Sequence, residues 1–230
     1  MRGAIFLVGL CCLACDSGEK PARGAGAPDV EAGLKRRFAD VSLPQEERLG
    51  AGGELLKAEG GAAFLAVQYR SGDRGLVLAL LDSLAGMDRV RASRLAAGLM
   101  EAARGEEKLT FEALLLQQGK DAVGPLTRLA AESKDWQTAM QALDALGKLK
   151  AREGIWAMRH RLRDPNTWVR MAAAHALGEV ADGGVVSALV EALEDTSDTV
   201  VAAAAVGLGR TGDARAVPPC AALLSHGNPR

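Results

Sequence analysis

From Val30 onward, the chain alternates short helical patterns with breaks. Large apolar residues recur three or four positions apart, as Leu34 and Phe38 do, and this spacing places apolar side chains on one face of a helix. Small and turn-forming residues end these patterns, for example at Gly60-Gly61. Residues 30–105 are therefore predicted to form helices, as degenerate copies of a repeat that is clearer downstream.

A repeat with a period of 31 residues organises the C-terminal half. Gly147, Gly178 and Gly209 are separated by this interval, and each follows directly after a leucine. A fixed period of this size is typical of architectures in which one supersecondary unit stacks on the next. Each copy contains two helical patterns, so residues 106–230 are predicted to form stacked helix pairs.

The second helix of each predicted pair carries an apolar stripe at positions i, i+3 and i+7, which marks one buried face. The three stripes are Ile155, Met158 and Leu162; Val186, Leu189 and Leu193; and Val217, Cys220 and Leu224.

Polar residues precede the predicted helices and can cap them. Asp164-Pro165, and Asp195 with Ser197, come before first helices, and we expect Pro165 to lie in a first turn. Asp182 and Asp213 recur between the two helices of a pair. Both are predicted to cap second helices rather than to act in acid-base chemistry.

The first helix of the best-defined copy resembles the HEAT-like repeats of phycobilin lyases. The pattern comprises Asp164, Val169, Arg170, Ala172, Ala173, Leu177 and Gly178. The resemblance implies an all-α fold, an α-solenoid of stacked antiparallel helix pairs. It also implies a ladder in which this arginine pairs with an aspartate of a neighbouring repeat. The ladder is in doubt because Ala139 and Val201 stand one period on either side of Arg170.

Residues 1–15 resemble the signal peptide of a bacterial lipoprotein. Arg2 precedes an apolar run from Ala4 to Ala14 that is too short to span a bilayer as a settled helix. The run ends at Leu13-Ala14-Cys15, similar to a lipobox, whose cysteine is acylated and becomes the new N-terminus. Here Cys12 stands where a lipobox usually has leucine. Ordinary signal-peptidase cleavage nearby, or an uncleaved anchor, are the alternatives.

Residues 16–29 contain Gly, Ala, Pro and charged residues with no large apolar side chain until Val30, which is typical of a flexible linker. Together with lipidation at Cys15, this linker predicts a protein anchored in the bacterial cell envelope. It would lie on the periplasmic side of the inner or outer membrane.

Composition and motifs narrow the classes of function. The formal net charge of −1 provides no overall attraction to nucleic acid. His160, His175 and His226 fall in unrelated repeat positions, and no His/Cys spacing indicates a metal site. The glycines sit at repeat positions rather than in a phosphate-binding loop. We therefore expect no cofactor, no metal, no small-molecule substrate and no catalytic residue.

The three tryptophans are the exception to the repeat pattern. Trp156, for example, is matched by Ser187 and Pro218 in the following copies. Exposed tryptophan is enriched at binding hot spots. On a helix, His160 and Arg163 share the side of Trp156, opposite the apolar stripe, in a segment rich in Arg and Lys. The predicted partner-binding residues are Trp136, Trp156, Arg159, His160, Arg163 and Trp168.

The alternative interpretation is that the indole rings cover gaps between adjacent hairpins and that the basic residues form a solvated face. If the strip does bind, its ligand would be an acidic protein segment, anionic lipid headgroups or another polyanion.

Three functions follow from these observations. The first is a non-catalytic scaffold for protein–protein interaction, anchored to the bacterial envelope. The second is an accessory enzyme that holds a prosthetic group for transfer, as the phycobilin lyases do, and it depends on the resemblance alone. The third is polyanion binding, including nucleic acid, which conflicts with the export signal.

Overall fold

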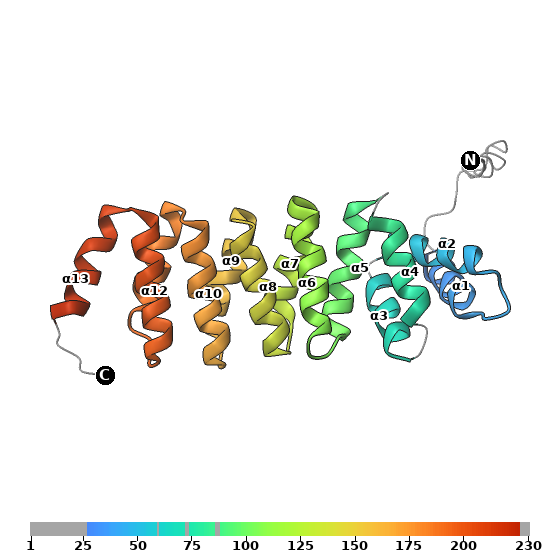
Figure 1. Ribbon diagram of the computed structural model, residues 1–230, viewed down its shortest axis with the longest axis horizontal. Helices are drawn as coiled ribbons and strands as arrows, with labels where there is room; N and C mark the ends of the chain where they lie inside the picture. Colours follow the sequence, from blue (N-terminus) through green and yellow to red (C-terminus); the bar gives the residue numbers. More distant parts are fainter. Residues whose placement is uncertain (1–26, 59, 72–73, 86–87, 226–230) are drawn as a thin grey trace.

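The protein is an elongated α-solenoid in which helices follow one another along the long axis (Figure 1). The computed structural model describes residues 27–58, 60–71, 74–85 and 88–225. No strand occurs within these ranges. The predicted fold class, all-α with stacked antiparallel helix pairs, is confirmed. The expected signal peptide, Cys15 and most of the linker lie outside the described residues.

The helices have the following bounds: α1 Ala27–Ala39, α2 Gln45–Leu55, α3 Gly61–Ser71, α4 Arg74–Ala85, α5 Arg89–Ala102, α6 Glu107–Gln118, α7 Val123–Glu132, α8 Trp136–Lys148, α9 Ile155–Arg161, α10 Thr167–Val180, α11 Val186–Ala192, α12 Asp198–Thr211 and α13 Val217–Ser225. Short 3₁₀ turns precede the second helices: η1 Gly119–Ala122, η2 Arg152–Gly154, η3 Gly183–Val185 and η4 Ala214–Ala216.

The 31-residue period of the sequence is also the period of the structure. The first helices α8, α10 and α12 begin at Trp136, Thr167 and Asp198, and the second helices α9, α11 and α13 begin 31 residues apart as well. The first helices α8, α10 and α12 pack side by side in one layer, while α5, α7 and α9 pack in the other. Helix α1 begins three residues before the expected onset at Val30.

Glycine and alanine let neighbouring first helices approach closely. A Cβ atom at Gly178 would lie 2.4 Å from the Cα atom of Gly207, and one at Gly147 would lie 3.0 Å from the Cα atom of Ala176. Real Cβ atoms do not approach a backbone atom to 2.4 Å. By contrast, a Cβ atom at Gly209 would have no described atom within 4 Å, because no described helix packs on that side of α12.

Each regular first helix is followed by a residue with a positive φ angle. Gly119, Lys150, Ala181 and Gly212 are one period apart and have φ angles of 62°, 50°, 50° and 63°. At Lys150, its own N–H donates to the carbonyl of Gly147, and the next N–H donates to the carbonyl of Leu146. This is the helix-ending arrangement in which glycine is usual. Two of the four positions nevertheless carry a side chain.

The apolar stripes of the second helices are largely buried. Met158, Val186 and Leu189 are buried, and Ile155, Leu162 and Leu193 pack against the core as half-buried residues. The third stripe departs from the prediction, because Val217 is 65% exposed. Stripe positions are buried only where the next hairpin covers them, and no described hairpin covers α13.

Basic side chains tie successive repeats together near the starts of the first helices. Two nitrogens of Arg170 donate to the two carboxylate oxygens of Asp195, at 2.7 and 2.9 Å. These hydrogen bonds from Arg170 hold the pKa of Asp195 below its usual range. The predicted arginine–aspartate contact therefore exists at Arg170, although Ala139 and Val201 cannot extend it.

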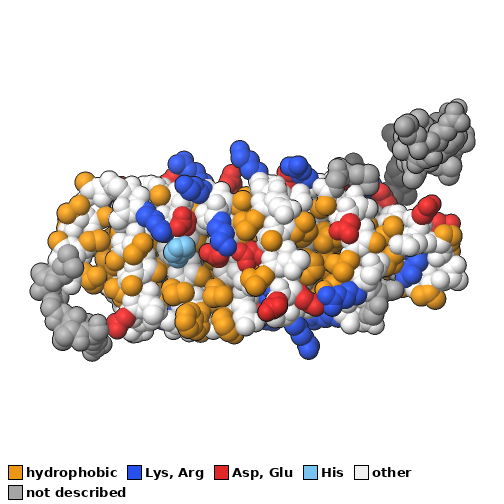
Figure 2. Space-filling view, in the orientation of Figure 1, with side chains coloured by type: hydrophobic (Ala, Val, Ile, Leu, Met, Phe, Trp, Pro, Cys, Tyr) orange, Lys and Arg blue, Asp and Glu red, His pale blue; other side chains and the backbone are white. Residues whose placement is uncertain are grey.

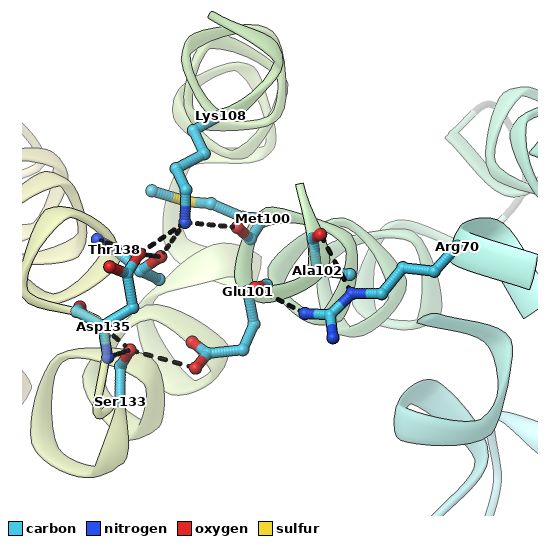
Figure 3. A network of polar contacts seen from close by, with 8 residues as sticks. All are labelled: Arg70, Met100, Glu101, Ala102, Lys108, Ser133, Asp135 and Thr138. Atoms are coloured by element: carbon cyan, nitrogen blue, oxygen red, sulfur yellow. Dashed lines mark hydrogen bonds and ion pairs between the residues drawn. The ribbon is translucent and has the colours of Figure 1, made fainter. Parts of the chain in front are cut away.

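Lys108 makes the corresponding contact two repeat periods earlier (Figure 3). Its buried ammonium group lies 2.6 Å from a carboxylate oxygen of Asp135 and donates to the hydroxyl of Thr138 and to the carbonyl of Met100. Burial raises the pKa of Asp135, but the hydrogen bonds from Lys108 and Thr138 outweigh that effect and lower the pKa to about 2. A lysine thus takes the place of the arginine.

The caps of the first helices differ in part from the prediction. Asn166, not Asp164, caps α10 by accepting from the N–H of Trp168, and Pro165 precedes the cap instead of lying in the first turn. Asp164 and Asp195 accept from the N–H of the N-cap residues, Asn166 and Ser197. Their carboxylates also form ion pairs with arginines. Both aspartates therefore lie before the helix and not at its cap. Contrary to the prediction, the hydroxyl of Ser197 does not cap α12, because it contacts the hydroxyl of Thr199 instead.

The predicted caps of the second helices are present at the 3₁₀ turns. Asp182 accepts from the N–H of Gly184, and Asp213 accepts from the N–H of Arg215.

We predict opposite effects of alanine at two equivalent glycines. Gly178→Ala will lower the free energy of unfolding by about 1–3 kcal/mol, because the added methyl group overlaps the backbone of α12. Gly209→Ala will raise it by about 0.5–1 kcal/mol, because the site is open and alanine favours a helix interior. Urea unfolding of both variants checks this. Equal effects at the two positions would contradict the packing described.

Acid will weaken the protein partly through Asp135. The pKa of this carboxyl is about 2 in the folded chain, against an ordinary value of 3.8. Because the folded pKa is lower, the stabilising contribution is fully present above about pH 4 and is lost as the pH falls towards 2. Asp135→Asn will remove this contribution, so that its urea midpoint changes less between pH 4 and pH 2 than that of the wild type. Asp121→Asn, at an exposed position, is the control, and identical pH profiles for wild type and Asp135→Asn would refute the assignment.

Candidate functional site

Helix α9 places an aromatic and basic strip on the surface. Met158 is buried between the helix layers and fixes which face of α9 points inwards. Trp156 is 58% exposed, and Arg159, His160 and Arg163 are exposed too. We call these four residues, Trp156, Arg159, His160 and Arg163, the α9 strip.

The α9 strip lines a groove between α9 and α11. All four of its residues border this space, which has a volume of about 840 Å³, and Ala188, Glu191 and Ala192 of α11 form the opposite wall. The structure therefore brings together four of the six residues predicted to bind a partner.

Two further arginines near this groove are engaged in the fold. Arg161 donates to the carbonyls of Ala130 and Ser133, each at 2.6 Å, and pairs with Asp164 at 2.6 Å. Arg170 neutralises Asp195. Sequence alone placed Arg161 among the basic residues around Trp156, but these contacts show that it joins α9 to the end of α7.

The cations of the strip are available to a ligand. Arg159 has no hydrogen bond or ion pair from its side chain to any residue that the structure describes. Arg163 lies 3.5 Å from Glu191, and the two side chains are 85% and 66% exposed. A pair this exposed contributes little and exchanges readily for another partner.

A second groove adjoins the strip on its other side, between α7 and α9. It has a volume of about 630 Å³ and shares Trp156 with the first groove. Its basic residues are Lys120, Arg128, Lys150 and Arg152, and its acidic residues are Glu132 and Glu153. Sequence reasoning missed most of this surface, although Lys120 and Lys150 stand out as charged residues at the repeating turns.

Positive charge is therefore concentrated locally on a chain whose formal net charge is −1. Figure 2 shows several Lys and Arg side chains along the upper edge of the solenoid and a second group on the lower edge. The two grooves beside Trp156 extend this basic character to the second-helix layer.

Trp136 and Trp168 do not join the α9 strip. They lie in the first turns of α8 and α10 and are 40% and 54% exposed. Both belong to the first-helix layer, and neither lines a groove beside Trp156. Their grouping with Trp156 in the sequence rested on residue type and not on position.

The histidines do not meet in the described part of the chain. The ring of His175 lies 3.6 Å from Glu179 and 3.4 Å from Arg210, whereas His160 belongs to the α9 strip. Within the described ranges, no three His, Cys, Asp or Glu side chains come close enough to hold a metal ion. None of the described helices has the length and apolarity needed to cross a membrane.

Comparison with solved structures finds several proteins to which this chain is similar. One is an engineered protein with 21% identity, covering 86% of this chain and 85% of its own, at a TM-score of 0.40. Another is a computationally designed armadillo repeat protein for modular peptide recognition, with 20% identity, 85% and 92% coverage and a TM-score of 0.42. Human deoxyhypusine hydroxylase in complex with glycerol has 17% identity, 88% and 91% coverage and a TM-score of 0.39.

Comparison with curated protein sequences finds no match. The family model for HEAT repeats matches residues 109–177 and 123–208. These residues include α8 to α11 and most of α6 and α12, where the 31-residue period is clearest. This part of the chain is thus similar to HEAT repeats, and the described residues fold as an α-solenoid of stacked helix pairs.

Proposed function

We propose that this protein is a non-catalytic interaction scaffold, anchored to the bacterial cell envelope, that binds an acidic segment of another protein on the α9 strip. The observation that supports it best is the exposed Trp156 between two basic grooves. An indole ring supplies a large contact area at little cost in conformational entropy, and arginine pairs with carboxylates in a two-pronged geometry.

The charges around Trp156 favour an acidic ligand over a basic one. Three arginines near the grooves are set aside because they pair with aspartates: Arg152 with Asp182, Arg161 with Asp164, and Arg170 with Asp195. The remaining five cations face three carboxylates: Lys120, Arg128, Lys150, Arg159 and Arg163 against Glu132, Glu153 and Glu191. Complementary charge speeds encounter and excludes basic partners. The flanking grooves give the ligand room on both sides of the ring.

Anchoring is proposed from the sequence. The apolar run before Cys15 would direct export. The linker up to residue 29 would hold the solenoid off the membrane surface, while lipidation of Cys15 keeps it attached. Each buried methylene of an acyl chain contributes about 0.8 kcal/mol to membrane affinity, so several chains provide a firm anchor.

The anchoring proposal predicts a modified N-terminus. Protein recovered from the membrane fraction of its bacterial host will have an intact mass that corresponds to a chain starting at Cys15 plus acyl groups. Cys15→Ser will prevent the modification and shift the protein out of that fraction. A soluble, unmodified chain that begins at Met1 would contradict lipidation and the envelope localisation with it.

The binding proposal predicts a defined loss on mutation. Random twelve-residue peptides selected on the full-length chain will be enriched in Asp and Glu. Trp156→Ala with Arg163→Ala will weaken the selected peptides about tenfold or more, because the aromatic contact and an arginine–carboxylate pair are both lost. Fluorescence anisotropy at two salt concentrations measures this.

Arg104→Ala with Leu109→Ala is the matched control, since both residues are exposed and neither lines a groove described here. Binding that survives the Trp156 and Arg163 changes would show that another surface is used. Capture of phosphatidylglycerol vesicles without any acidic peptide would replace the protein partner by a lipid surface.

A further inference from the structure

A third groove lies on the second-helix layer, among α3, α5 and α7. It has a volume of about 880 Å³. Its floor and walls are mostly small or apolar: Leu56, Ala58, Ala62, Ala63, Ala66, Val67, Ala97, Gly98, Ala102, Pro125 and Leu129. Val67 is 59% exposed in this groove. An aliphatic side chain in an apolar groove suits an apolar ligand.

Close packing of α3 against α5 forms the floor of this groove. A Cβ atom at Gly98 would lie 3.3 Å from the carbonyl oxygen of Ala62, so α3 and α5 are in near-contact along the floor. The alanines on both helices leave space above that contact which larger side chains would have filled. The groove is therefore a built feature of the packing.

Two of the six charged residues that line this groove, Arg70 and Glu101, are held by the fold (Figure 3). Arg70 donates to the carbonyls of Ala102 and Glu101 at the end of α5, at 3.1 and 3.2 Å. Glu101 in turn accepts from the hydroxyl of Ser133 at 3.1 Å. Both side chains are fixed at the edge of the groove, so the apolar floor is left for the ligand.

The three grooves adjoin one another, and together we call them the track. The α3–α5–α7 groove shares Gly124, Arg128 and Glu132 with the α7–α9 groove, which shares Trp156 with the α9–α11 groove. The chemistry changes along the track: basic and aromatic around α9, aliphatic between α3 and α7.

We propose that a single extended peptide segment of the partner occupies this track, with its acidic residues around Trp156 and its apolar residues in the α3–α5–α7 groove. This inference rests on the proposed function and adds a second half to the ligand. Neighbouring helices pack about 8–10 Å apart, so five successive helices span about 32–40 Å. An extended chain covers this distance with about 10–12 residues.

The test uses the full-length chain and random twelve-residue peptides, selected by display and then synthesised. The selected peptides will carry Asp and Glu in one half and aliphatic residues in the other. Ala63→Glu with Val67→Glu will weaken these peptides about tenfold or more, because charged side chains then line the apolar groove. The same change will leave the affinity of the isolated acidic half unaltered.

Leu109→Glu is the control for the added charge, since Leu109 is 54% exposed and lies outside the track. Thermal unfolding followed by circular dichroism verifies that every variant is folded. Selected peptides without an apolar half, or unchanged affinity in the Ala63 and Val67 variant, would overturn the inference.

The two proposals fail in different ways. If acidic peptides bind at Trp156 but ignore the Ala63 and Val67 changes, the extended track is wrong and the proposed function stands. If the selected peptides are purely apolar and ignore the Trp156 and Arg163 changes, the acidic-partner proposal is wrong, and so is the composite ligand.

Discussion

The close approach of neighbouring first helices is the contact on which the solenoid depends. At Gly147 and Gly178 the backbone of the next helix fills the space that a Cβ atom would occupy. This distance fixes how far one repeat is from the next, and therefore the spacing of the second helices and the width of the grooves between them. A change at these glycines would alter the grooves of the second-helix layer without touching a residue that lines them.

Polar contacts between repeats also fix how successive repeats are placed. Arg170 with Asp195, and Lys108 with Asp135, hold the turn before one first helix against the preceding repeat. Each cation is largely buried and satisfied by backbone or side-chain acceptors, which is the condition under which a buried charge is tolerated. Arg161 extends this role to the second-helix layer, whereas Arg159 on the same helix is exposed to solvent.

Much of the fold could be predicted from the sequence because a fixed period repeats every local signal. Helix starts at 136, 167 and 198 follow from it. The period could not show that Val217 is exposed, since burial depends on a covering hairpin, nor decide between Asp164 and Asn166 as the cap. Lys108 could not be predicted from the arginine pattern, because it is a lysine and lies two periods before Arg170. The α9 strip follows from helical geometry, but the grooves combine residues some thirty positions apart.

The turns that end the first helices have a consequence for how such a protein can diversify. A positive φ angle costs a residue with a side chain about 1–2 kcal/mol relative to glycine, yet Lys150 and Ala181 have one at the positions that Gly119 and Gly212 occupy in other repeats. Lys150 thereby adds a cation to the α7–α9 groove. One position per repeat can thus vary in chemistry while the helix contacts remain as they are, so the ligand preference of the surface can evolve one turn at a time.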